Sequence, residues 1–426
     1  MQRPLKVLIN AQLIPGKPGG TEQFLTSLVY ALGRLTQSNE EYILITHAHH
    51  PDWLKPLLGP NQRIVLGPEP QAERLGRAKQ WLGPLRRPAS NLYYGLRQLV
   101  SRGPRQDSEA LPQSGGFYES LGGEVIHFPY QEFTRSRLPA IFNPHDLQHL
   151  HYPQFFSRGA IALRESVYQA ACREAQAVAT PSVAVKADLE EQYGLDTQKI
   201  FVIHYGAPSA LYGDLTDGIL HEVREKFRLP SSFAFFPAQT WPHKNHLRLL
   251  EALRLVRDRE GRRLNLVCSG AKNDHWPAIQ RRVDKLGLQE QVAFLGYISP
   301  LELRALYHLA EFVVFPSLFE GGGFPVIEAL QEGVAVACSD LPSLQEYGGE
   351  AVLKFDPQSV ESIATCLLRI SQDEGLREHL RTRGKERICR FTWERTARTY
   401  RALYRKVGGV SLSKEDLDLL STNKVC

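Results

Sequence analysis

Two carboxylates and three glycines stand close together in one segment of the chain. The glycines lie between an apolar run and Pro325, which suits the first turn of a helix because its missing N–H costs nothing there. Open backbone N–H groups at the positive end of a helix bind anions, so this turn predicts a diphosphate site. The members of the segment are Glu320, Gly321, Gly322, Gly323 and Glu328.

The two carboxylates flank this turn at different distances. Glu320 precedes the glycines, so its side chain can reach a group beyond the phosphates. Glu328 lies about one turn inside the expected helix and can accept two hydrogen bonds from vicinal hydroxyls, such as those of a ribose. The segment thus predicts sugar, diphosphate and ribose sites in order. The alternative interpretation is a glycine-rich loop with Glu328 on a solvated face.

A second group of polar residues follows the first strand expected in the second half of the chain. Lys244 lies between that strand, residues 233–237, and an expected helix, residues 247–257. Ligands of open α/β sheets bind at the carboxyl ends of strands, which favours a phosphate-neutralising role for Lys244 over simple solvent exposure. Trp241 and His246 are among the residues that restrict the lysine side chain.

Two further stretches follow expected strands of the first half. Gly19 and Gly20 precede the first long helix and let the backbone approach a ligand closely, although a plain tight turn is the simpler interpretation. His145, His149 and His151 form the second stretch, and they could bind a metal. Prolines around them favour a loop rather than a regular element, so a polar pocket wall contacting a sugar is preferred, with His145 as its main residue.

The elements that must position these residues are short apolar runs alternating with longer amphipathic ones. This alternation predicts parallel sheets with right-handed crossovers. It restarts after a polar linker at residues 206–232, so we expect an α/β fold of two doubly wound, Rossmann-like domains facing each other across a cleft. The expected strands are 6–9, 42–46, 125–128, 140–142, 177–180, 200–203, 233–237, 264–268, 292–295, 312–315 and 334–337; the expected helices are 22–35, 159–174, 247–257, 276–286, 301–309 and 325–332.

The composition excludes several classes of protein. The 426 residues include 51 Lys and Arg against 46 Asp and Glu, and the net charge of +5 is too small for a dedicated nucleic-acid binder. No run of about 18 apolar residues is present, so no membrane-spanning helix is expected. The apolar start is too short for a signal peptide, and the six cysteines lie far apart, so we expect a cytoplasmic protein.

Residues 59–122 interrupt the alternation, because they are rich in Gly, Pro, Gln and Arg. Basic residues outnumber acidic ones there, and aromatic residues are interleaved. One interpretation is an ordinary solvated helix with a mobile loop. The other is a surface that meets a polyanionic acceptor or anionic lipid, to which each basic residue contributes ~1 kcal/mol. The second interpretation predicts a peripheral protein on the inner face of the membrane.

Taken together, these segments resemble the retaining glycosyltransferases of family four, which share the GT-B fold. In that family two glutamates are separated by seven residues in a Glu-Gly-Phe-Gly-Leu-Pro context; here Gly322 and Phe324 replace the usual Phe and Leu. The resemblance covers patches over most of the chain, in the family's order of motifs. It implies a first domain at 1–210 with a crossing helix at 392–408 and a second domain at 211–391. The tail at 409–426 is expected to be loosely attached, as chain ends often are.

The resemblance also implies a role for each candidate residue. Glu320 would contact hydroxyls of the donor sugar, Glu328 the ribose, and Lys244 the diphosphate. Many members carry an arginine five or six residues before this lysine, where the present chain has Ala238 and Gln239. The remaining implied contacts are the N–H groups of Gly322, Gly323 and Phe324 and the side chain of His243 at the diphosphate, His145 beside the transferred sugar, Gly19 and Gly20 on the first-domain wall of the cleft, and Gly296 and Tyr297 near the base.

The resulting expectation is a hexosyltransferase that moves a sugar, with retention, from a nucleoside diphosphate to an acceptor hydroxyl in polysaccharide or glycolipid biosynthesis. The acceptor would be a glycan or a lipid-linked glycan, and no metal or other cofactor is expected. The local sequences around His145 and Lys244 resemble those of mannosyltransferase-like members of bacterial polysaccharide assembly, which suggests GDP-mannose as the donor. The alternatives are a non-catalytic nucleotide-sugar-binding protein, a GT-B sugar-nucleotide epimerase, and a metal hydrolase built on the three histidines.

Overall fold

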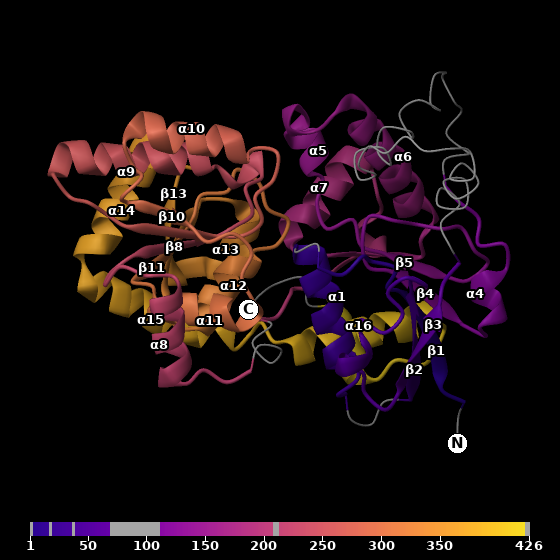
Figure 1. The fold of residues 1–426 in the computed structure, drawn as a ribbon. Helices are drawn as coiled ribbons and strands as arrows, with labels where there is room; N and C mark the ends of the chain where they lie inside the picture. The colour runs from indigo at the N-terminus through magenta and orange to yellow at the C-terminus, as the bar shows by residue number, and fades with distance from the viewer. Residues whose placement is uncertain (1–2, 17–18, 36–38, 69–110, 208–212, 422–426) are drawn as a thin grey trace, which may run out of the picture.

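The computed structural model describes residues 3–16, 19–35, 39–68, 111–207 and 213–421. They form two parallel sheets, of seven and six strands, each with its own helices (Figure 1). The predicted α/β fold with two doubly wound domains is therefore confirmed. The exact boundaries at 210/211 and 391/392 stay a prediction.

The first sheet has the strand order β3-β2-β1-β4-β5-β6-β7. Side chains alternate between its faces: Val7 and Ile9 belong to the same core as helix α1 (Gly20–Leu32), and Leu8 belongs to the core of helices α6 (Arg158–Glu174) and α7 (Val183–Tyr193). Both faces are covered, as an all-parallel sheet requires. The strands are β1 (Leu5–Asn10), β2 (Glu40–Thr46), β3 (Gln62–Leu66), β4 (Val125–Phe128), β5 (Ala140–Phe142), β6 (Ala177–Thr180) and β7 (Ile200–Val202).

The second sheet has the strand order β10-β9-β8-β11-β12-β13. The chain order reverses between β8 and β11, and the crevice beyond the carboxyl ends of such neighbours is the usual ligand site. The strands are β8 (Ala234–Pro237), β9 (Leu266–Ser269), β10 (Val292–Phe294), β11 (Phe312–Phe315), β12 (Ala335–Ser339) and β13 (Val352–Phe355). The helices are α8 (Asp217–Lys226), α9 (His246–Glu260), α10 (Trp276–Leu286), α11 (Pro300–Leu309), α12 (Phe324–Gln331), α13 (Pro342–Gly348), α14 (Val360–Gln372) and α15 (Glu374–Ile388).

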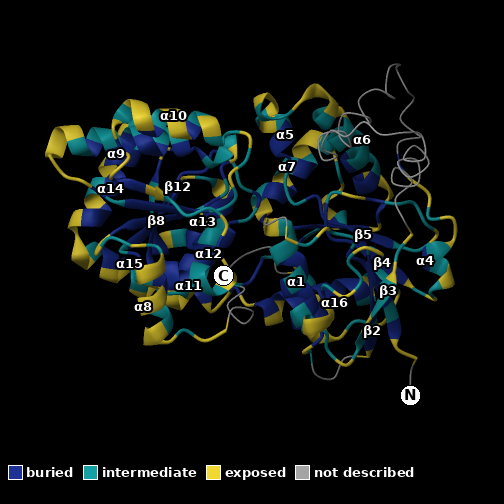
Figure 2. Ribbon diagram, in the orientation of Figure 1, coloured by how far each residue is buried: buried dark blue, intermediate teal, exposed yellow. Residues whose placement is uncertain are grey.

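Helix α16 (Trp393–Val407) returns to the first domain and packs beside α1 (Figure 1). Its inward side is buried, as are the strands between the helical layers (Figure 2). The Tyr404 hydroxyl lies 2.9 Å from His127 Nδ1, and the Tyr400 hydroxyl accepts a hydrogen bond of 2.6 Å from Asn143 Nδ2. These buried polar contacts fix the position of α16 on the first sheet.

The structure corrects the expected organisation at the end of the chain. Helix α17 (Lys414–Ser421) lies in the tail that was expected to be loosely attached. Its Asp416 is 1% exposed and accepts a hydrogen bond of 3.1 Å from Arg405 Nη1 in α16. Arg405 also donates from Nε to Glu40 at 2.6 Å, so a buried triad of charges attaches α17 to the first domain.

Two strands, β3 and β13, and several helices, among them α7, α8, α13, α14 and α15, were not predicted from the sequence. Strands β3 and β13 lie at the outer edges of their sheets, where side chains are only partly buried and no clean apolar run is needed. Helix α8 lies within the expected linker and buries Val223.

Most of the basic segment, residues 69–110, lies outside the described residues, and with it the predicted membrane or acceptor surface. In the part of the chain that the structure describes, no helix is long and apolar enough to cross a membrane.

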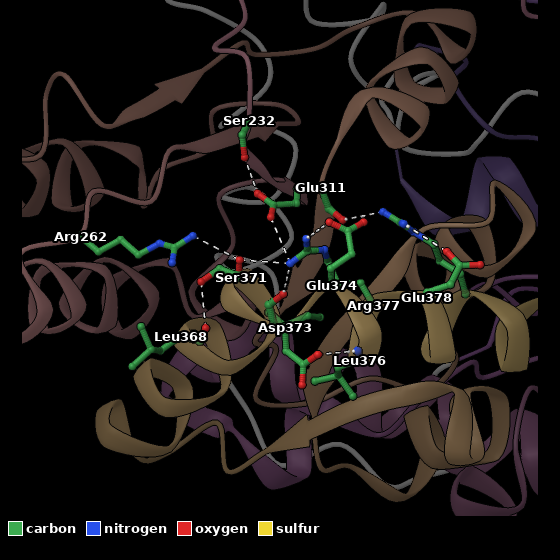
Figure 3. Close-up of polar contacts among 12 residues, drawn as sticks. Ser232, Arg262, Glu311, Leu368, Ser371, Asp373, Glu374, Leu376, Arg377 and Glu378 are labelled. Carbon is green, nitrogen blue, oxygen red and sulfur yellow. Dashed lines mark hydrogen bonds and ion pairs between the residues drawn. The ribbon is translucent and has the colours of Figure 1, made fainter.

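A buried arginine closes the amino edge of the second sheet (Figure 3). Arg377, in α15 and 7% exposed, pairs with Glu311 at 3.2 Å and donates to the carbonyl of Ile370 at 2.8 Å. Ser232, which precedes β8, donates to Glu311. These contacts lie before the strands rather than after them, so this arginine holds the α14–α15 turn on the sheet and is remote from the crevice.

Candidate active site

Lys244 and Glu320, which are 76 residues apart, form an ion pair at the crevice of the second domain. Lys244 follows β8 and Glu320 follows β11, the neighbouring strands at which the chain order reverses. Lys244 Nζ donates to Glu320 Oε1 at 2.6 Å, and the side chains are only 16% and 11% exposed. An ammonium group has three N–H donors, so two of them remain for an anionic ligand.

The turn that carries Lys244 is held by Asn245. Asn245 adopts a left-handed conformation with φ of 65°, which asparagine tolerates better than most residues. Its side-chain Nδ2 donates to the carbonyls of Pro316 at 3.0 Å and Pro357 at 2.8 Å. The loop after β8 is thereby tied to the loop after β11, which fixes the lysine opposite the glutamate.

His243 adds no positive charge to this site at neutral pH. Burial lowers the pKa of His243 well below 6.5, and the nearby Lys244 lowers it further. Its imidazole is therefore neutral, and it could donate a hydrogen bond but not compensate the charge of a diphosphate. The predicted contact of His243 with a diphosphate would therefore be a hydrogen bond between a neutral ring and the anion.

The glycine turn lies against the first domain. A Cβ atom on Gly321 would lie 2.2 Å from the carbonyl oxygen of His145, and one on Gly322 would lie 2.9 Å from Tyr205 Cε2. A Cβ on Gly323 would lie 2.7 Å from Leu344 of the same domain. The absence of side chains is thus required by close packing, whether or not a ligand also approaches the turn.

The same turn presents unused N–H donors. Within the described residues, four successive N–H groups at the start of α12 donate to no acceptor. Helix α12 has eight residues, and its dipole adds partial positive charge at this end. The turn therefore has the open donors that the predicted anion site requires. The four groups belong to Gly321, Gly322, Gly323 and Phe324.

Glu328 lies between the domains and not on a solvated face. It is 6% exposed, and its Oε2 accepts a hydrogen bond of 2.6 Å from the Tyr307 hydroxyl. Its Oε1 accepts from Gln23 Nε2, which α1 of the first domain supplies. Its carboxylate is thus held by side chains of both domains.

His145 lies beside the glycine turn, but its ring is engaged within the first domain. Its Nε2 lies 2.7 Å from the carbonyl oxygen of Pro129, and its Nδ1 lies 2.6 Å from the Tyr205 hydroxyl. A carbonyl only accepts, so Nε2 carries the hydrogen and Nδ1 accepts from Tyr205. Burial lowers the pKa of His145, so the ring is neutral near pH 7.

The two other histidines of this stretch point to separate partners. His149 Nε2 lies 2.7 Å from Glu165 Oε1, and His151 Nε2 lies 2.8 Å from Asp188 Oδ1. Among the described residues, no group of three or more His, Cys, Asp and Glu side chains could hold a metal ion. The metal-hydrolase alternative therefore has no geometric basis.

The four remaining candidates lie at two places. A Cβ on Gly20 would lie 3.6 Å from Phe324, and one on Gly19 would lie 3.8 Å from Gln239, so the start of α1 faces the second domain. Gly296 and Tyr297 follow β10, which is two strands from β8, and Tyr297 is 62% exposed. Neighbouring strands are about 4.8 Å apart, so β10 lies roughly 10 Å from β8 across the sheet.

Sequence reasoning missed the residues that join the two domains. The ring of Tyr205 in the first domain stacks on that of Phe324 in the second, with centroids 4.8 Å apart. The ring of Trp393, the first residue of α16, also stacks on Tyr205. Gln23 and Tyr307 hold Glu328, as described above. Tyr205 follows β7 by three residues, which was a positional signal, but nothing marked Gln23 or Tyr307 in the sequence.

Two family models match the chain. The model described as "Glycosyl transferases group 1" matches residues 221–387, and the model described as "Glycosyltransferase Family 4" matches residues 122–210. The first match contains Lys244, Glu320 and Glu328, and the second contains His145 and Tyr205.

Curated relatives and a solved structure agree with these matches. The chain is 27% identical over 271 residues to O-antigen chain mannosyltransferase B of Escherichia coli, covering 63% of this chain and 71% of that protein. It is 28% identical over 246 residues to O-antigen chain mannosyltransferase RfbU of Salmonella typhimurium, covering 56% of this chain and 64% of that protein. Sucrose-phosphate synthase from Thermosynechococcus elongatus superposes with a TM-score of 0.70 at 20% identity, covering 96% of this chain and 100% of that one, and so shares the fold.

Proposed function

The chain belongs to the retaining glycosyltransferases of family four with the GT-B fold, and from this premise we propose that it transfers mannose from GDP-mannose to an acceptor hydroxyl of a polysaccharide under assembly. The observation that carries the proposal is the Lys244–Glu320 pair beside the four unused N–H groups of the glycine turn. The two O-antigen mannosyltransferases support the choice of sugar.

The departing nucleoside diphosphate gains negative charge as the bond to the sugar breaks. Lys244, with two spare donors, and the N–H groups of Gly322, Gly323 and Phe324 are positioned to stabilise that charge. Preorganised donors of this kind supply the largest contribution to many enzymatic rates. Because protein groups supply this compensation, the proposal requires no metal ion.

The two carboxylates would hold the donor on either side of the diphosphate. Glu320 uses Oε1 for Lys244 and keeps Oε2 for hydroxyls of the sugar. Glu328 would accept from the ribose hydroxyls, and the donor that Gln23 now provides to Oε1 would be exchanged for one of them. His145, beside the glycine turn, would adjoin the transferred sugar.

Retention follows if the acceptor attacks the face from which the diphosphate departs. The bond from the anomeric carbon to the phosphate oxygen breaks, and the bond to the acceptor oxygen forms on the same face. The departing phosphate oxygen takes the acceptor proton, so no side chain is assigned as a base. The close contact between the glycine turn and the first domain would exclude water and limit hydrolysis of the donor.

The first experiment is a thermal-shift screen with GDP-, UDP- and ADP-sugars. A ligand at about 100 times its dissociation constant stabilises the folded protein by ~2.7 kcal/mol, and GDP-mannose should give the largest shift. A larger shift with a UDP- or ADP-sugar would overturn the donor assignment. Formation of an isomer from the donor alone would favour the epimerase alternative.

The second experiment measures sugar transfer by Lys244→Ala and Glu320→Gln. Lys244→Ala should lose at least about a hundredfold in rate, which is the usual cost of removing one transition-state donor. Glu320→Gln should also lower the rate, because it removes the carboxylate charge that holds Lys244 and would accept from the sugar hydroxyls. Lys226→Ala is the matched control, because Lys226 pairs with Glu302 at the surface and is 56% exposed. Turnover equal to wild type in both site variants would favour the non-catalytic binding protein and contradict the mechanism.

A further inference from the structure

The three residues that lead into α7 all contact the second domain. They are residues 181–183, which follow the end of β6, and Ser182 is fully buried. The carbonyl of Pro181 accepts a hydrogen bond of 2.6 Å from the Tyr347 hydroxyl. The hydroxyl of Ser182 donates to the carbonyl of Gly321 at 2.8 Å. The N–H of Val183 donates to Glu346 Oε2 at 2.8 Å.

The second-domain partners on either side of Ser182 are themselves fixed. Glu346 also accepts from the N–H of Ala184 at 2.8 Å, so its carboxylate sits at the positive end of α7. The Tyr347 hydroxyl accepts from the N–H of Tyr205 at 3.1 Å. Arg387 donates to the carbonyls of Glu346 and Tyr347 at 2.6 and 2.9 Å, which anchors the end of α13.

Two serine hydroxyls orient the glycine turn from opposite domains. Ser343 of the second domain donates to the carbonyl of Glu320 at 2.6 Å, and Ser182 of the first domain donates to the carbonyl of Gly321. In a trans peptide the C=O and the following N–H point in opposite directions. The N–H groups of Gly321 and Gly322 therefore point away from the serines, and they are among the unused donors described above.

We propose that Ser182 is a positioning residue for the donor diphosphate: when the domains are closed, its hydroxyl holds Gly321 O and so directs the N–H of Gly322 at the phosphate. Ser343 can act in either state of the cleft, because it shares a domain with the turn. Ser182 acts only while the first domain is in contact. The anion site is thus completed by closure, and the proposal rests on the function proposed above.

The test compares Ser182→Ala with Ser182→Thr, which keeps the hydroxyl. Ser182 Oγ also caps α7 by accepting from Val185 N at 3.2 Å. Ser157→Ala is the matched control, because Ser157 Oγ caps α6 in the same way, from Ala160 N at 3.2 Å, and among the described residues it bonds only within its own helix. GDP affinity is measured by calorimetry, and kcat and KM are measured for donor and acceptor separately.

Ser182→Ala should weaken GDP binding by about tenfold, the equivalent of one good hydrogen bond, and lower kcat for transfer without changing the KM of the acceptor. Ser182→Thr should restore both, and Ser157→Ala should match wild type. Should Ser182→Ala fail to fold, Tyr347→Phe, which frees the carbonyl of Pro181 and the N–H of Tyr205 but keeps the Ser182 hydroxyl on Gly321, should show a smaller loss in the same direction.

Equal GDP affinity in wild type, Ser182→Ala and Tyr347→Phe would overturn this inference alone. A loss in Ser157→Ala as large as that in Ser182→Ala would also overturn it, since helix capping would then explain the effect. Failure of the wild-type protein to bind GDP, UDP and ADP would overturn the proposed function and this inference with it.

Discussion

Gly321 is the residue at which the glycine turn comes closest to the first domain. A Cβ there would lie 2.2 Å from His145 O and 3.0 Å from Asp146 Cβ, and both are held by the fold. We therefore expect Gly321→Ala to keep both domains folded but to separate them, with a loss of at least about tenfold in transfer. Small-angle scattering and a transfer assay measure the two effects.

Gly218→Ala is the control for that substitution. Gly218 lies in α8, and a Cβ there would meet nothing closer than Thr216 Oγ1 at 3.8 Å. This variant should transfer at the wild-type rate and melt no lower than wild type, because alanine favours helix over glycine. Wild-type transfer by Gly321→Ala would contradict the requirement for close approach.

Gln23 and Glu328 should have opposite effects on donor affinity. In the proposed function Gln23 occupies one of the positions that a ribose hydroxyl would take on Glu328. Gln23→Ala removes that competitor, so we expect donor binding to tighten by a few fold, whereas Glu328→Gln should weaken it by about tenfold. Calorimetry with GDP-mannose measures both, and a change in the same direction for the two variants would contradict the ribose assignment.

Whole elements were predictable where a buried run is bounded by turn residues. Strand β11 was expected at residues 312–315 and is found at Phe312–Phe315, because each of its residues is buried. Strand β13 was missed because Leu353 and Lys354 are only partly buried at the edge of the sheet. An apolar run in the sequence marks a strand whose side chains are buried. Strands at the edge of a sheet bury fewer side chains, so they carry no such run.

The candidate site divides in the same way. Lys244, Glu320 and Glu328 could be predicted, because each follows a strand or a helix start in its own domain and carries a charge. Gln23 could not be, since its partner Glu328 is 305 residues away. Which first-domain side chains meet the second domain depends on how two finished domains pack, and no local pattern encodes that.

Helix α17 should be attached mainly by its buried charge. Asp416 is 1% exposed and pairs with Arg405, whereas Glu415 on the same helix pairs with Arg398 at the surface and is 46% exposed. We expect Asp416→Asn to lower the free energy of unfolding by about 2 kcal/mol, because Arg405 is left with one carboxylate. Glu415→Gln should cost less than about 1 kcal/mol. Urea unfolding measures both, and equal losses would contradict this attachment.

Across the whole molecule, buried neutral histidines make stability depend on pH. Burial lowers the pKa of His127 in the first domain and of His246 in the second from 6.5 to about 3. Between these values the unfolded chain binds protons that the folded protein does not, so stability falls as the pH falls below 6.5. Each histidine then lowers the free energy of unfolding by about 1.4 kcal/mol for each pH unit. Between pH 6.5 and 5 most carboxylates contribute little, because their usual pKa values lie lower. Burial raises the pKa of Glu22, Asp188 and Glu332, which act in the opposite direction to the histidines.

His246 isolates one half of this effect, because it can be replaced without breaking a hydrogen bond. Both of its ring nitrogens are buried without a partner in the described residues, and the ring packs on Phe236 and Phe294. His246→Leu should therefore be as stable as wild type or more so at pH 7.5, and it should lose about 2 kcal/mol less than wild type between pH 6.5 and 5. Urea unfolding at each pH measures the difference, and His221→Gln, a substitution at an exposed position of α8, should follow wild type. If His246→Leu declines with pH as steeply as wild type, protonation of this buried imidazole does not contribute to the acid sensitivity of the protein.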